Sequence, residues 1–520
     1  MATEGLDLGF RPTIGEALRR AAERFGERDF LVMPDRRISF GEAEAASANL
    51  ARRLLAAGIG KGTRVGLFFT YGPEWLVSWL AVSRIGALCM PFSTTYRPAE
   101  LGKVLRLGDV DTLLLPHRLL GRDLEPFLVD TVPGLASSDG PPHFLAELPY
   151  LRSVWMSGGH PPGWARPLDF DPTPLDPVDD ALLRAVEDEV VPADWAVVVY
   201  TSGSSAEPKG VVHTHGTVLR DTAGLAQMME AQAAQTGHPP RLFCAFPFFW
   251  VGGILCLGAA LQAGHTLLCL ERFEPGPALE LIERERGTAT LGWPTLISAL
   301  RDHPSFAERD LGSAPSLTSG PADMALLETP VPGIPGHRGM SETMGQHQLV
   351  EERVRDVDTG EDLPEMAEGE LVIRGPGLMA AYYKQEREEV FGADGWFHTG
   401  DRVFQHEGRA YFVGRYTEII KSRGANVSPR EVELALETFP EILHAFVVGL
   451  PHAEHGEEVV AVLVAADGAE IDPEAVRRQA REDLSSFKVP TRIEVWPVEE
   501  IPWLPSHKPD KLKIRAALEQ

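Results

Sequence analysis

Trp195-Ala-Val-Val-Val-Tyr200 runs directly into Thr201-Ser-Gly-Ser-Ser-Ala-Glu-Pro-Lys209-Gly210. The first part is apolar and largely β-branched, which is typical of a buried strand. The second part is rich in hydroxyl groups and glycine and contains one lysine, so it offers backbone N–H groups and a cation to a polyphosphate. The sequence therefore predicts a phosphate-binding loop after a buried strand. Its expected phosphate contacts are Thr201, Ser202, Gly203, Ser204, Ser205 and Lys209.

The lysine of this loop follows proline and precedes glycine, whereas a mononucleotide P-loop ends in Gly-Lys-Ser/Thr. The ordinary P-loop interpretation therefore fails.

Nearer the N-terminus, Thr13 to Phe25 has helical spacing, Ser39 to Glu42 has the spacing of a capping box, and Arg64 to Phe69 reads as a buried strand. This alternation predicts an α/β fold with a mainly parallel sheet covered by helices.

Composition restricts the possible partners. The chain has 520 residues, which suggests two or more packed units, and a formal net charge of −26, which argues against nucleic acid and anionic membranes as partners. Each of the four cysteines lies in an apolar segment without metal-ligand spacing, which favours buried, reduced thiols in a cytoplasmic protein. The N-terminal residues lack the basic and apolar regions of a signal peptide.

Leu242 to Leu270 contains no Asp, Glu, Lys or Arg and is long enough to cross a bilayer. Pro247, the adjacent Gly252 and Gly253, and Gly264 interrupt it. We therefore expect a buried strand, a turn, a helix and a second strand in an α/β core, with no integral membrane association.

The pattern changes after Gly414-Arg415 to a compact unit of about 100 residues, an ordinary domain size. Two apolar runs in it, Ala445 to Gly449 and Val459 to Val464, read as strands. We predict two domains, residues 1–415 and residues 416–520, with the boundary near residues 415–418.

The loop and the further segments below, in this order, resemble the adenylate-forming superfamily, which includes acyl-CoA synthetases, stand-alone adenylation domains and luciferases. The resemblance covers nearly the whole chain. The family loop reads Ser/Thr-Ser-Gly-Ser/Thr-Thr-Gly-x-Pro-Lys-Gly, and here Ala206 replaces a glycine. The resemblance implies a large N-terminal α/β domain for ATP and carboxylate, and a small, mobile α+β domain at the C-terminus.

Three segments resemble the parts of the family that bind adenosine and metal. Leu317-Thr-Ser-Gly-Pro-Ala322 is similar to the adenine loop, Arg338-Gly-Met-Ser-Glu342 to Tyr-Gly-x-Thr-Glu, and Trp396-Phe-His-Thr-Gly-Asp401 to the ribose segment. The adenine and ribose contacts so implied are Ser319, Gly320, Pro321, Arg338, Gly339, Met340, Ser341, Asp401 and Arg415. Glu342 would be the catalytic carboxylate that holds Mg²⁺, because a hard cation on phosphate oxygens prefers an oxygen ligand.

Phe246-Pro-Phe-Phe-Trp-Val-Gly-Gly253 resembles the aromatic segment that opens the carboxylate pocket. The acyl pocket residues so implied are Phe249, Trp250, Gly252 and Trp293. Amino-acid-activating relatives carry an aspartate nearby, and this segment has none. Since an uncompensated ammonium in an apolar pocket is costly, we expect a bulky apolar acid rather than an amino acid.

The C-terminal segments resemble the hinge, the CoA channel and the catalytic lysine of the family. The hinge position falls on Thr417, and Lys421 to Glu431 resembles the loop of the pantetheine channel, with Arg423 and Gly424. Ser428-Pro-Arg-Glu431 also has the pattern of a capping box, so we assign Glu431 no catalytic role. The ending Leu504-Pro-Ser-His-Lys508-Pro-Asp-Lys511 favours Lys508 as the catalytic lysine, with Lys511 as the rival.

The resemblance implies an AMP-forming acyl-CoA synthetase that uses ATP, CoA, a small-molecule carboxylic acid and Mg²⁺. Two alternatives stay open. One is an acyl-AMP ligase that loads the thiol of a carrier protein. The other is a non-catalytic adenylate-binding sensor, suggested by the departures at Ala206, Arg338, Thr417 and His507.

Overall fold

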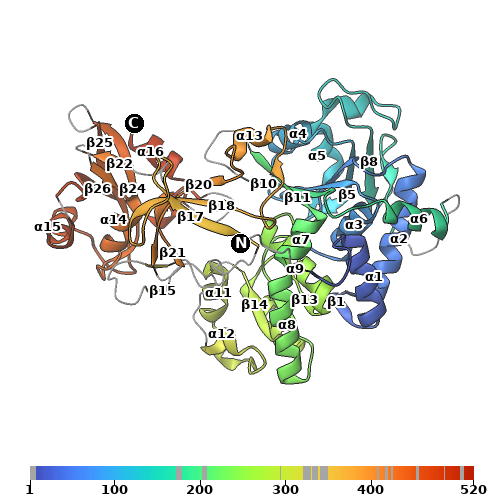
Figure 1. Cartoon of the computed structure of the whole chain (residues 1–520), viewed down its shortest axis with the longest axis horizontal. Helices are drawn as coiled ribbons and strands as arrows, with labels where there is room; N and C mark the ends of the chain where they lie inside the picture. The colour runs from blue at the N-terminus through green and yellow to red at the C-terminus, as the bar shows by residue number, and fades with distance from the viewer. Residues whose placement is uncertain are drawn as a thin grey trace. The chain divides into compact units, whose positions relative to one another are not determined.

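A computed structural model describes residues 7–170, 178–201, 208–292, 294–319, 329–330, 338–339, 349–406, 409–415, 420–422, 425–452, 456–484, 486–503 and 509–519. The chain forms two compact units (Figure 1). Unit 1 consists of Met1–Ala325 together with Gly375–Val390, and unit 2 of Leu326–Arg374 together with Phe391–Gln520. Helices and strands alternate through unit 1, so the predicted α/β class is confirmed.

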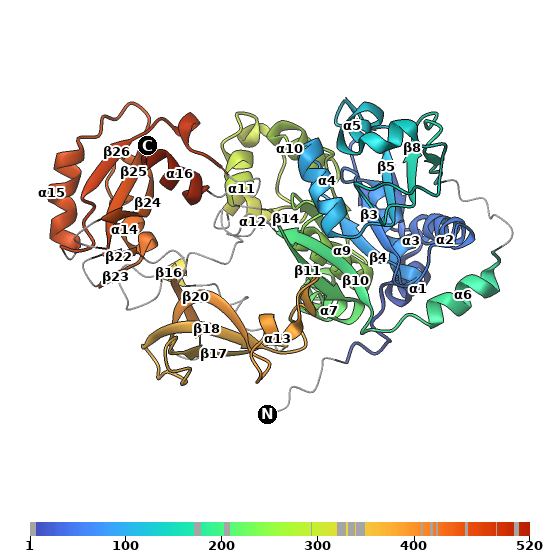
Figure 2. The same cartoon turned by 90° about the horizontal axis from the view of Figure 1, so that it is seen from above.

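The larger sheet of unit 1 has eight strands in the order β19-β11-β10-β4-β3-β5-β8-β9. Figure 2 labels β11, β10, β4, β3, β5 and β8 of this sheet. The strands from β10 to β9 run parallel to one another, and β11 and β19 are antiparallel to their neighbours. The sheet is therefore mainly parallel, as the sequence predicts. Their bounds are β3 Arg64–Leu67, β4 Leu88–Pro91, β5 Thr112–Pro116, β8 Ser153–Ser157, β9 Arg166–Pro167, β10 Trp195–Thr201, β11 Lys209–Thr214 and β19 Ala381–Tyr382.

The second sheet of unit 1 has the order β14-β12-β13-β1-β2. Its strands are β1 Asp29–Val32, β2 Arg37–Ser39, β12 Arg241–Cys244, β13 Thr266–Leu268 and β14 Ala289–Leu291. The charge-free stretch from Leu242 to Leu270 forms β12, a turn, helix α9 (Val251–Ala263) and β13, as the sequence predicts. Among the described residues, no helix combines the length and the apolar character that crossing a bilayer requires.

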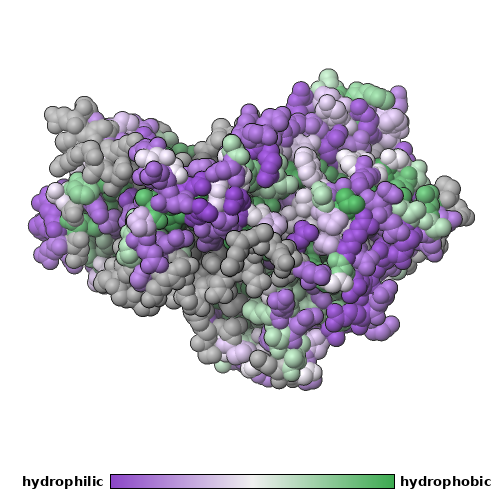
Figure 3. All heavy atoms as spheres, viewed as in Figure 1, coloured by the Kyte–Doolittle hydropathy of each residue, from purple (hydrophilic) through white to green (hydrophobic). Residues whose placement is uncertain are grey.

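Helices cover both sheets of unit 1. They are α1 Ile14–Phe25, α2 Phe40–Ala56, α3 Pro73–Arg84, α4 Pro98–Leu107, α5 Leu124–Thr131, α6 Asp180–Asp188, α7 His215–Asp221, α8 Ala223–Thr236, α10 Pro275–Arg284, α11 Pro294–Arg301, α12 Pro315–Ser319 and α13 Arg387–Val390. The capping box predicted at Ser39 is present, because its hydroxyl accepts a hydrogen bond from the Glu42 N–H and the Glu42 carboxylate accepts one from the Ser39 N–H. On the face drawn in Figure 3, hydrophilic side chains predominate over α1 and α2.

Unit 2 contains a four-stranded antiparallel sheet, β17 (Glu351–Arg355), β18 (Glu368–Arg374), β20 (Phe397–His406) and β21 (Arg409–Arg415). A separate sheet follows, with β22 Ile420–Ser422, β23 Ala425–Val427, β24 Ile442–His452, β25 Gly456–Ala465 and β26 Arg492–Val495. Helices α14 (Pro429–Leu436), α15 (Pro473–Asp483) and α16 (Lys511–Leu518) accompany it, and the strands expected at 445–449 and 459–464 lie within β24 and β25.

The chain passes from one sheet of unit 2 to the other between Arg415 and Ile420. The predicted domain boundary at residues 415–418 falls in this interval. By its contacts, the sheet of residues 351–415 belongs with the C-terminal residues rather than with unit 1. The division into residues 1–415 and 416–520, which concerns movement rather than contact, stays a prediction.

The cysteines Cys89, Cys244, Cys256 and Cys269 are buried and form no disulfide. Burial raises the thiol pKa of Cys89 and Cys269 far above the ordinary value. In the part of the chain that the structure describes, no group of three or more His, Cys, Asp or Glu side chains is placed to hold a metal ion. The buried thiols are therefore structural and unreactive.

Several histidines of unit 1, two of them fully buried, make its stability depend on pH. His265 is fully buried, neither of its ring nitrogens has a hydrogen-bond partner among the described residues, and burial lowers its pKa from 6.5 to about 3. His215 is also fully buried, and its Nδ1 accepts a hydrogen bond from the Ile14 N–H at 3.2 Å. Burial lowers the His215 pKa to about 4.

We expect acid to destabilise unit 1 through these histidines. The unfolded chain binds a proton at each histidine below about pH 6.5, while the folded chain does not until near pH 4 or below, so stability present above pH 6.5 is lost as the pH falls. The loss approaches about 1.4 kcal/mol per pH unit for each residue. Urea unfolding at pH 7.0 and 5.5 measures it, and His265→Leu should show a shallower dependence. An unchanged dependence would remove His265 from the account.

Candidate active site

The strands that frame the predicted phosphate loop are β10 and β11, an antiparallel pair. Thr201 lies directly opposite Lys209, and its hydroxyl donates a hydrogen bond to the Lys209 carbonyl at 3.4 Å. The structure thus brings both ends of the loop together. The other predicted phosphate contacts, Ser202, Gly203, Ser204 and Ser205, lie outside the described residues, as does Ala206.

The glycine after the loop lysine has a steric reason. A Cβ added to Gly210 would lie 2.8 Å from Cγ1 of Val198 and 3.1 Å from Cβ of Tyr383. Both distances are shorter than normal carbon contacts, so a side chain at this position would push β11 away from its neighbours. The Lys-Gly pair is therefore built into the sheet, where β19 packs against β11.

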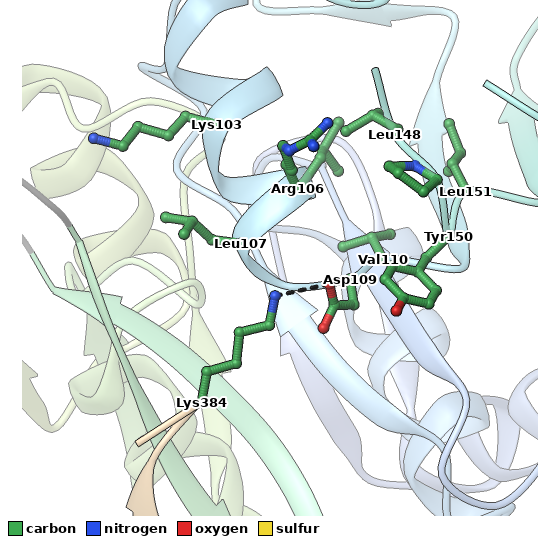
Figure 4. Close-up of a pocket in the computed structure, with 11 residues that line it drawn as sticks. Lys103, Arg106, Leu107, Asp109, Val110, Leu148, Tyr150, Leu151 and Lys384 are labelled. Atoms are coloured by element: carbon green, nitrogen blue, oxygen red, sulfur yellow. Dashed lines mark hydrogen bonds and ion pairs between the residues drawn. The ribbon is translucent and has the colours of Figure 1, made fainter. Parts of the chain in front are cut away.

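A cavity of about 470 Å³ lies beside the segment that carries β19 (Figure 4). The ammonium of Lys384 contacts Oδ1 of Asp109 at 2.8 Å across this cavity, and both residues have a positive φ. Arg106, on another wall, donates to the Glu147 carbonyl at 2.6 Å. Two of the cations around the cavity are thus already paired, and the Lys384–Asp109 pair ties the segment after β19 to the end of α4.

Asp401 and Arg415 are fourteen positions apart in the sequence, but they are direct partners across strands β20 and β21. The backbone register thereby places an acidic residue opposite a basic residue at one end of an antiparallel pair. A carboxylate can accept hydrogen bonds from two neighbouring hydroxyls, and a guanidinium can donate to hydroxyl or phosphate oxygens. The pair has the chemistry that binding a ribose phosphate requires.

Glu370 of β18 holds the β-bulge of β20 that precedes Asp401. Its Oε1 accepts a hydrogen bond from the Gly400 N–H at 2.9 Å, and its Oε2 lies 2.8 Å from Nδ1 of His398. The Thr399 hydroxyl accepts from the Asp401 N–H at 3.0 Å and donates to the Leu371 carbonyl at 2.7 Å. Sequence reasoning missed Glu370, because nothing in its local pattern separates it from an exposed strand carboxylate.

Trp396 begins the same motif and is 2% exposed. The guanidinium carbons of Arg353, Arg355 and Arg374 lie 5.0, 5.0 and 4.5 Å from the centre of its indole ring. Hydrogen bonds from these arginines hold the carboxyl pKa of Glu351 and Asp394 below the ordinary range. The motif is therefore fixed at its start by a buried ring among paired arginines, and at its end by Glu370.

The aromatic segment predicted to open the acyl pocket ends at the start of α9. Phe249 is 8% exposed, and its ring lies edge to face with that of Trp250 at 6.2 Å between centroids. Phe248 is fully buried against Tyr71 and Trp75, so it belongs to the core. A Cβ on Gly252 would lie 3.0 Å from the Phe246 ring, so this glycine lets the helix start pack on the aromatic turn.

The predicted site residues between 293 and 342 and those of the C-terminal segments fall only partly within the described residues. Ser319 ends α12, and Arg338 and Gly339 form strand β16, which pairs with β15 (Thr329–Pro330). Lying outside the described residues are Trp293, Gly320, Pro321, Met340, Ser341, Glu342, Thr417, Arg423, Gly424 and Lys508.

Asp221, the last residue of α7, is a second carboxylate that sequence reasoning missed. Burial raises the pKa of this carboxyl to about 8, against a smaller opposite effect of Arg220. Only the fold reveals its burial, because the sequence shows an ordinary Arg-Asp pair at a helix end.

Ser428 and Lys511 have structural roles. The Ser428 hydroxyl accepts a hydrogen bond from the Glu431 N–H at 3.4 Å, and Pro429 starts α14, so the Ser428 half of the predicted capping box is confirmed, while the Glu431 carboxylate pairs with Lys488 at 2.5 Å. Lys511 contacts Oε1 of Glu433 at 2.7 Å, and the Glu433 side chain is only 5% exposed. This ion pair joins α16 to α14.

Comparison with known proteins agrees with these motifs. The model of the AMP-binding enzyme family matches residues 18–329, and that of the AMP-binding enzyme C-terminal domain matches residues 431–508. A putative acyl-CoA synthetase of Bacillus subtilis, YngI, is 27% identical over 97% of this chain and 96% of its own length. A feruloyl-CoA synthase of an Amycolatopsis species is 29% identical over 88% of this chain and 89% of its own length.

Among solved structures, the amide bond synthetase McbA of Marinactinospora thermotolerans superposes with a TM-score of 0.75 at 26% identity, covering 97% of this chain and 99% of McbA. The family model covers more than half of the chain and includes both strands of the phosphate loop. The chain therefore belongs to the AMP-binding enzyme family, the adenylate-forming superfamily that its motifs resemble.

Proposed function

We propose that this chain is an AMP-forming acyl-CoA synthetase, which joins a carboxylic acid to the thiol of CoA through an acyl-adenylate. The observation that carries the proposal is the pairing of Asp401 with Arg415 across β20 and β21, within a chain of the AMP-binding family. Relatives named as acyl-CoA and feruloyl-CoA synthases support the choice of CoA as acceptor. The sequence places the protein in the cytoplasm, and that location stays a prediction.

In the first half-reaction a carboxylate oxygen attacks the α-phosphorus of ATP, the bond from that phosphorus to the bridging oxygen breaks, and pyrophosphate leaves. Both reactants are anions, so the protein's main tasks are positioning and charge neutralisation. Lys209 and the loop after Thr201 would hold the pyrophosphate. Lys508 would contact the carboxylate and the α-phosphate, and Asp401 with Arg415 would fix the ribose.

In the second half-reaction the CoA sulfur attacks the carbonyl carbon of the acyl-adenylate. The carbon–oxygen bond to AMP breaks, and the thiol proton goes to solvent. Lys508 and the loop around Gly424 lie in the same C-terminal segment, so a rotation about residues 415–418 would exchange one for the other between the two steps.

Mg²⁺ belongs to the proposal as the ion that neutralises phosphate charge when bound. Glu342 would hold it, since a carboxylate oxygen is the donor that this hard cation prefers. Glu342 lies outside the described residues.

We propose a bulky, apolar acid as substrate. Phe249 and Trp250 place two large rings at the start of α9, and the segment from Phe246 to Gly253 contains no acidic side chain to pair an ammonium group. A relative that is named for feruloyl-CoA synthesis is consistent with an aromatic acid.

A panel of acids, each incubated with ATP, MgCl₂ and CoA, tests the function, with mass spectrometry of the products. We expect an acyl-CoA thioester, AMP and pyrophosphate with aromatic or branched apolar acids, and little product with acetate or amino acids. A parallel arm replaces CoA by a simple amine, because one structural neighbour is an amide bond synthetase. Amide without thioester would change the acceptor, as would thioester formed only on a carrier protein, and no pyrophosphate release with any acid would favour a binding sensor.

The clamp by Glu370 leads to a prediction for ATP binding. Glu370→Ala removes the two carboxylate oxygens that hold the β-bulge before Asp401. We expect KM for ATP to rise about tenfold with kcat less affected. Glu370→Gln keeps one carbonyl acceptor, so its KM for ATP should lie between those of the parent and Glu370→Ala.

Glu351→Ala on the neighbouring strand β17 is the matched control, because Glu351 pairs with Arg353 and Arg374 rather than with the β-bulge before Asp401. Pyrophosphate exchange at varied ATP measures each KM. Equal effects of Glu351→Ala and Glu370→Ala would show that the clamp only stabilises the sheet.

A further inference from the structure

We propose that Tyr382 is a positioning residue for Lys209, holding the loop lysine in place for the polyphosphate. Nζ of Lys209 lies over the phenol ring of Tyr382, 5.2 Å from its centre. Tyr382 is in β19, where it is paired with Val211 of β11, two residues after Lys209. The inference rests on the proposed phosphate role of Lys209 and adds a residue that no motif of the sequence analysis contains.

The ring is held in place by the backbone on both sides of it. The Ala380 N–H donates to the Val212 carbonyl at 2.8 Å, and the Tyr383 N–H donates to the Gly210 carbonyl at 2.7 Å. These bonds fix β19 along β11, so the position of the ring follows that of the lysine backbone. The two residues move as parts of one sheet edge.

The next residues anchor the segment to the body of unit 1. Lys384 pairs with Asp109 at 2.8 Å, and the Tyr383 hydroxyl lies 3.5 Å from the other oxygen of the same carboxylate (Figure 4 shows the Lys384–Asp109 contact). Burial, with a smaller effect of Asp109, raises the Tyr383 pKa to about 12, so this phenol stays neutral and packed. Tyr382 is therefore anchored twice: its own strand pairs with β11, and the ion pair of Lys384 holds the residues that follow it.

An aromatic ring is suited to this task because it attracts a cation without neutralising it. A carboxylate partner would hold the ammonium more strongly and would compete with the incoming phosphate groups. Among the residues that the structure describes, Lys209 has no carboxylate partner. The ring thus limits the positions that the ammonium samples, and the ammonium keeps its full positive charge for the phosphate groups of the ligand.

A double-mutant cycle tests the inference with purified, full-length protein. Calorimetric titration with ATP in MgCl₂ gives the dissociation constant of the parent, Tyr382→Leu, Tyr382→Phe, Lys209→Ala and the double variant Tyr382→Leu/Lys209→Ala. We expect Tyr382→Leu to weaken ATP binding about threefold to tenfold and Tyr382→Phe to stay within about twofold of the parent, because phenylalanine keeps the π face. In the Lys209→Ala background, Tyr382→Leu should have no further effect.

A purely structural role for Tyr382 predicts a different pattern. Tyr382→Leu would then weaken binding by the same factor with and without Lys209, and that result would overturn the inference, as would equal losses in Tyr382→Phe and Tyr382→Leu. If Lys209→Ala itself leaves ATP binding unchanged, it is the phosphate role of Lys209 that fails. Should Tyr382→Leu not fold, Tyr382→Trp serves the same cycle, because its stronger π face should tighten ATP binding only when Lys209 is present.

Discussion

Lys508→Ala is expected to slow acyl-adenylate formation by on the order of 10²-fold or more, comparable to the loss of one preorganised donor that stabilises developing charge. The carboxylate and the α-phosphate repel each other as they approach, and in the proposed mechanism Lys508 would contact both. Removing the cation therefore raises the energy of the transition state more than that of the bound substrates. Pyrophosphate exchange, which reports only the first half-reaction, measures the effect.

Lys511 is the alternative for this role, and its surroundings argue against it. Its ammonium contacts Glu433 at 2.7 Å, and Oε1 of Glu433 also accepts a hydrogen bond from the Val447 N–H at 2.9 Å. Lys511 thus neutralises a carboxylate that is nearly buried between α14, β24 and α16. A lysine with this task in the folded protein is poorly available for chemistry.

Lys511→Ala is accordingly the matched control for Lys508→Ala. We expect it to lower the free energy of unfolding by about 1–3 kcal/mol, because it removes a charged partner of Glu433, and to leave the exchange rate of the folded enzyme close to normal. Thermal unfolding and pyrophosphate exchange separate the two effects. Near-normal exchange in Lys508→Ala together with loss in Lys511→Ala would reassign the catalytic lysine.

Features written in short stretches of sequence could be predicted. Strand β10, the helix within residues 242–270 and the caps at Ser39 and Ser428 follow from local periodicity and local hydrogen bonds. The motif order also named Asp401 and Arg415, and in the fold they are backbone partners across β20 and β21, while their role stays a prediction.

The residues that sequence reasoning missed act through distant contacts. Glu370 accepts a hydrogen bond from Gly400, 30 positions away in the sequence. Tyr382 contacts Lys209 from a segment in which the chain returns to unit 1. The raised pKa of Asp221 depends on what surrounds it in space. Such properties arise from packing between elements, and no periodicity along the chain encodes them.

Glu187→Ala is expected to destabilise unit 1 strongly. The Glu187 side chain is 3% exposed and accepts from Arg84 Nε at 2.6 Å, while its other oxygen pairs with Arg19. Arg84 is itself 2% exposed and also pairs with Glu44 at 2.8 Å. The cluster joins α6 to α1, α2 and α3. Removing the carboxylate leaves the Arg84 charge only partly compensated inside the protein, which costs about 3–5 kcal/mol.

Urea unfolding, followed by a probe in unit 1, should therefore show a large loss for Glu187→Ala and almost none for Glu189→Ala, an exposed carboxylate two positions further on. The double variant Arg84→Leu/Glu187→Ala sharpens the test. If the cost comes from an unpaired buried charge, removing Arg84 as well relieves part of it, so the double variant loses less than the two single variants together. Strictly additive losses would mean that each side chain contributes by packing alone, and the ion pair would then have no part in holding α6 in place.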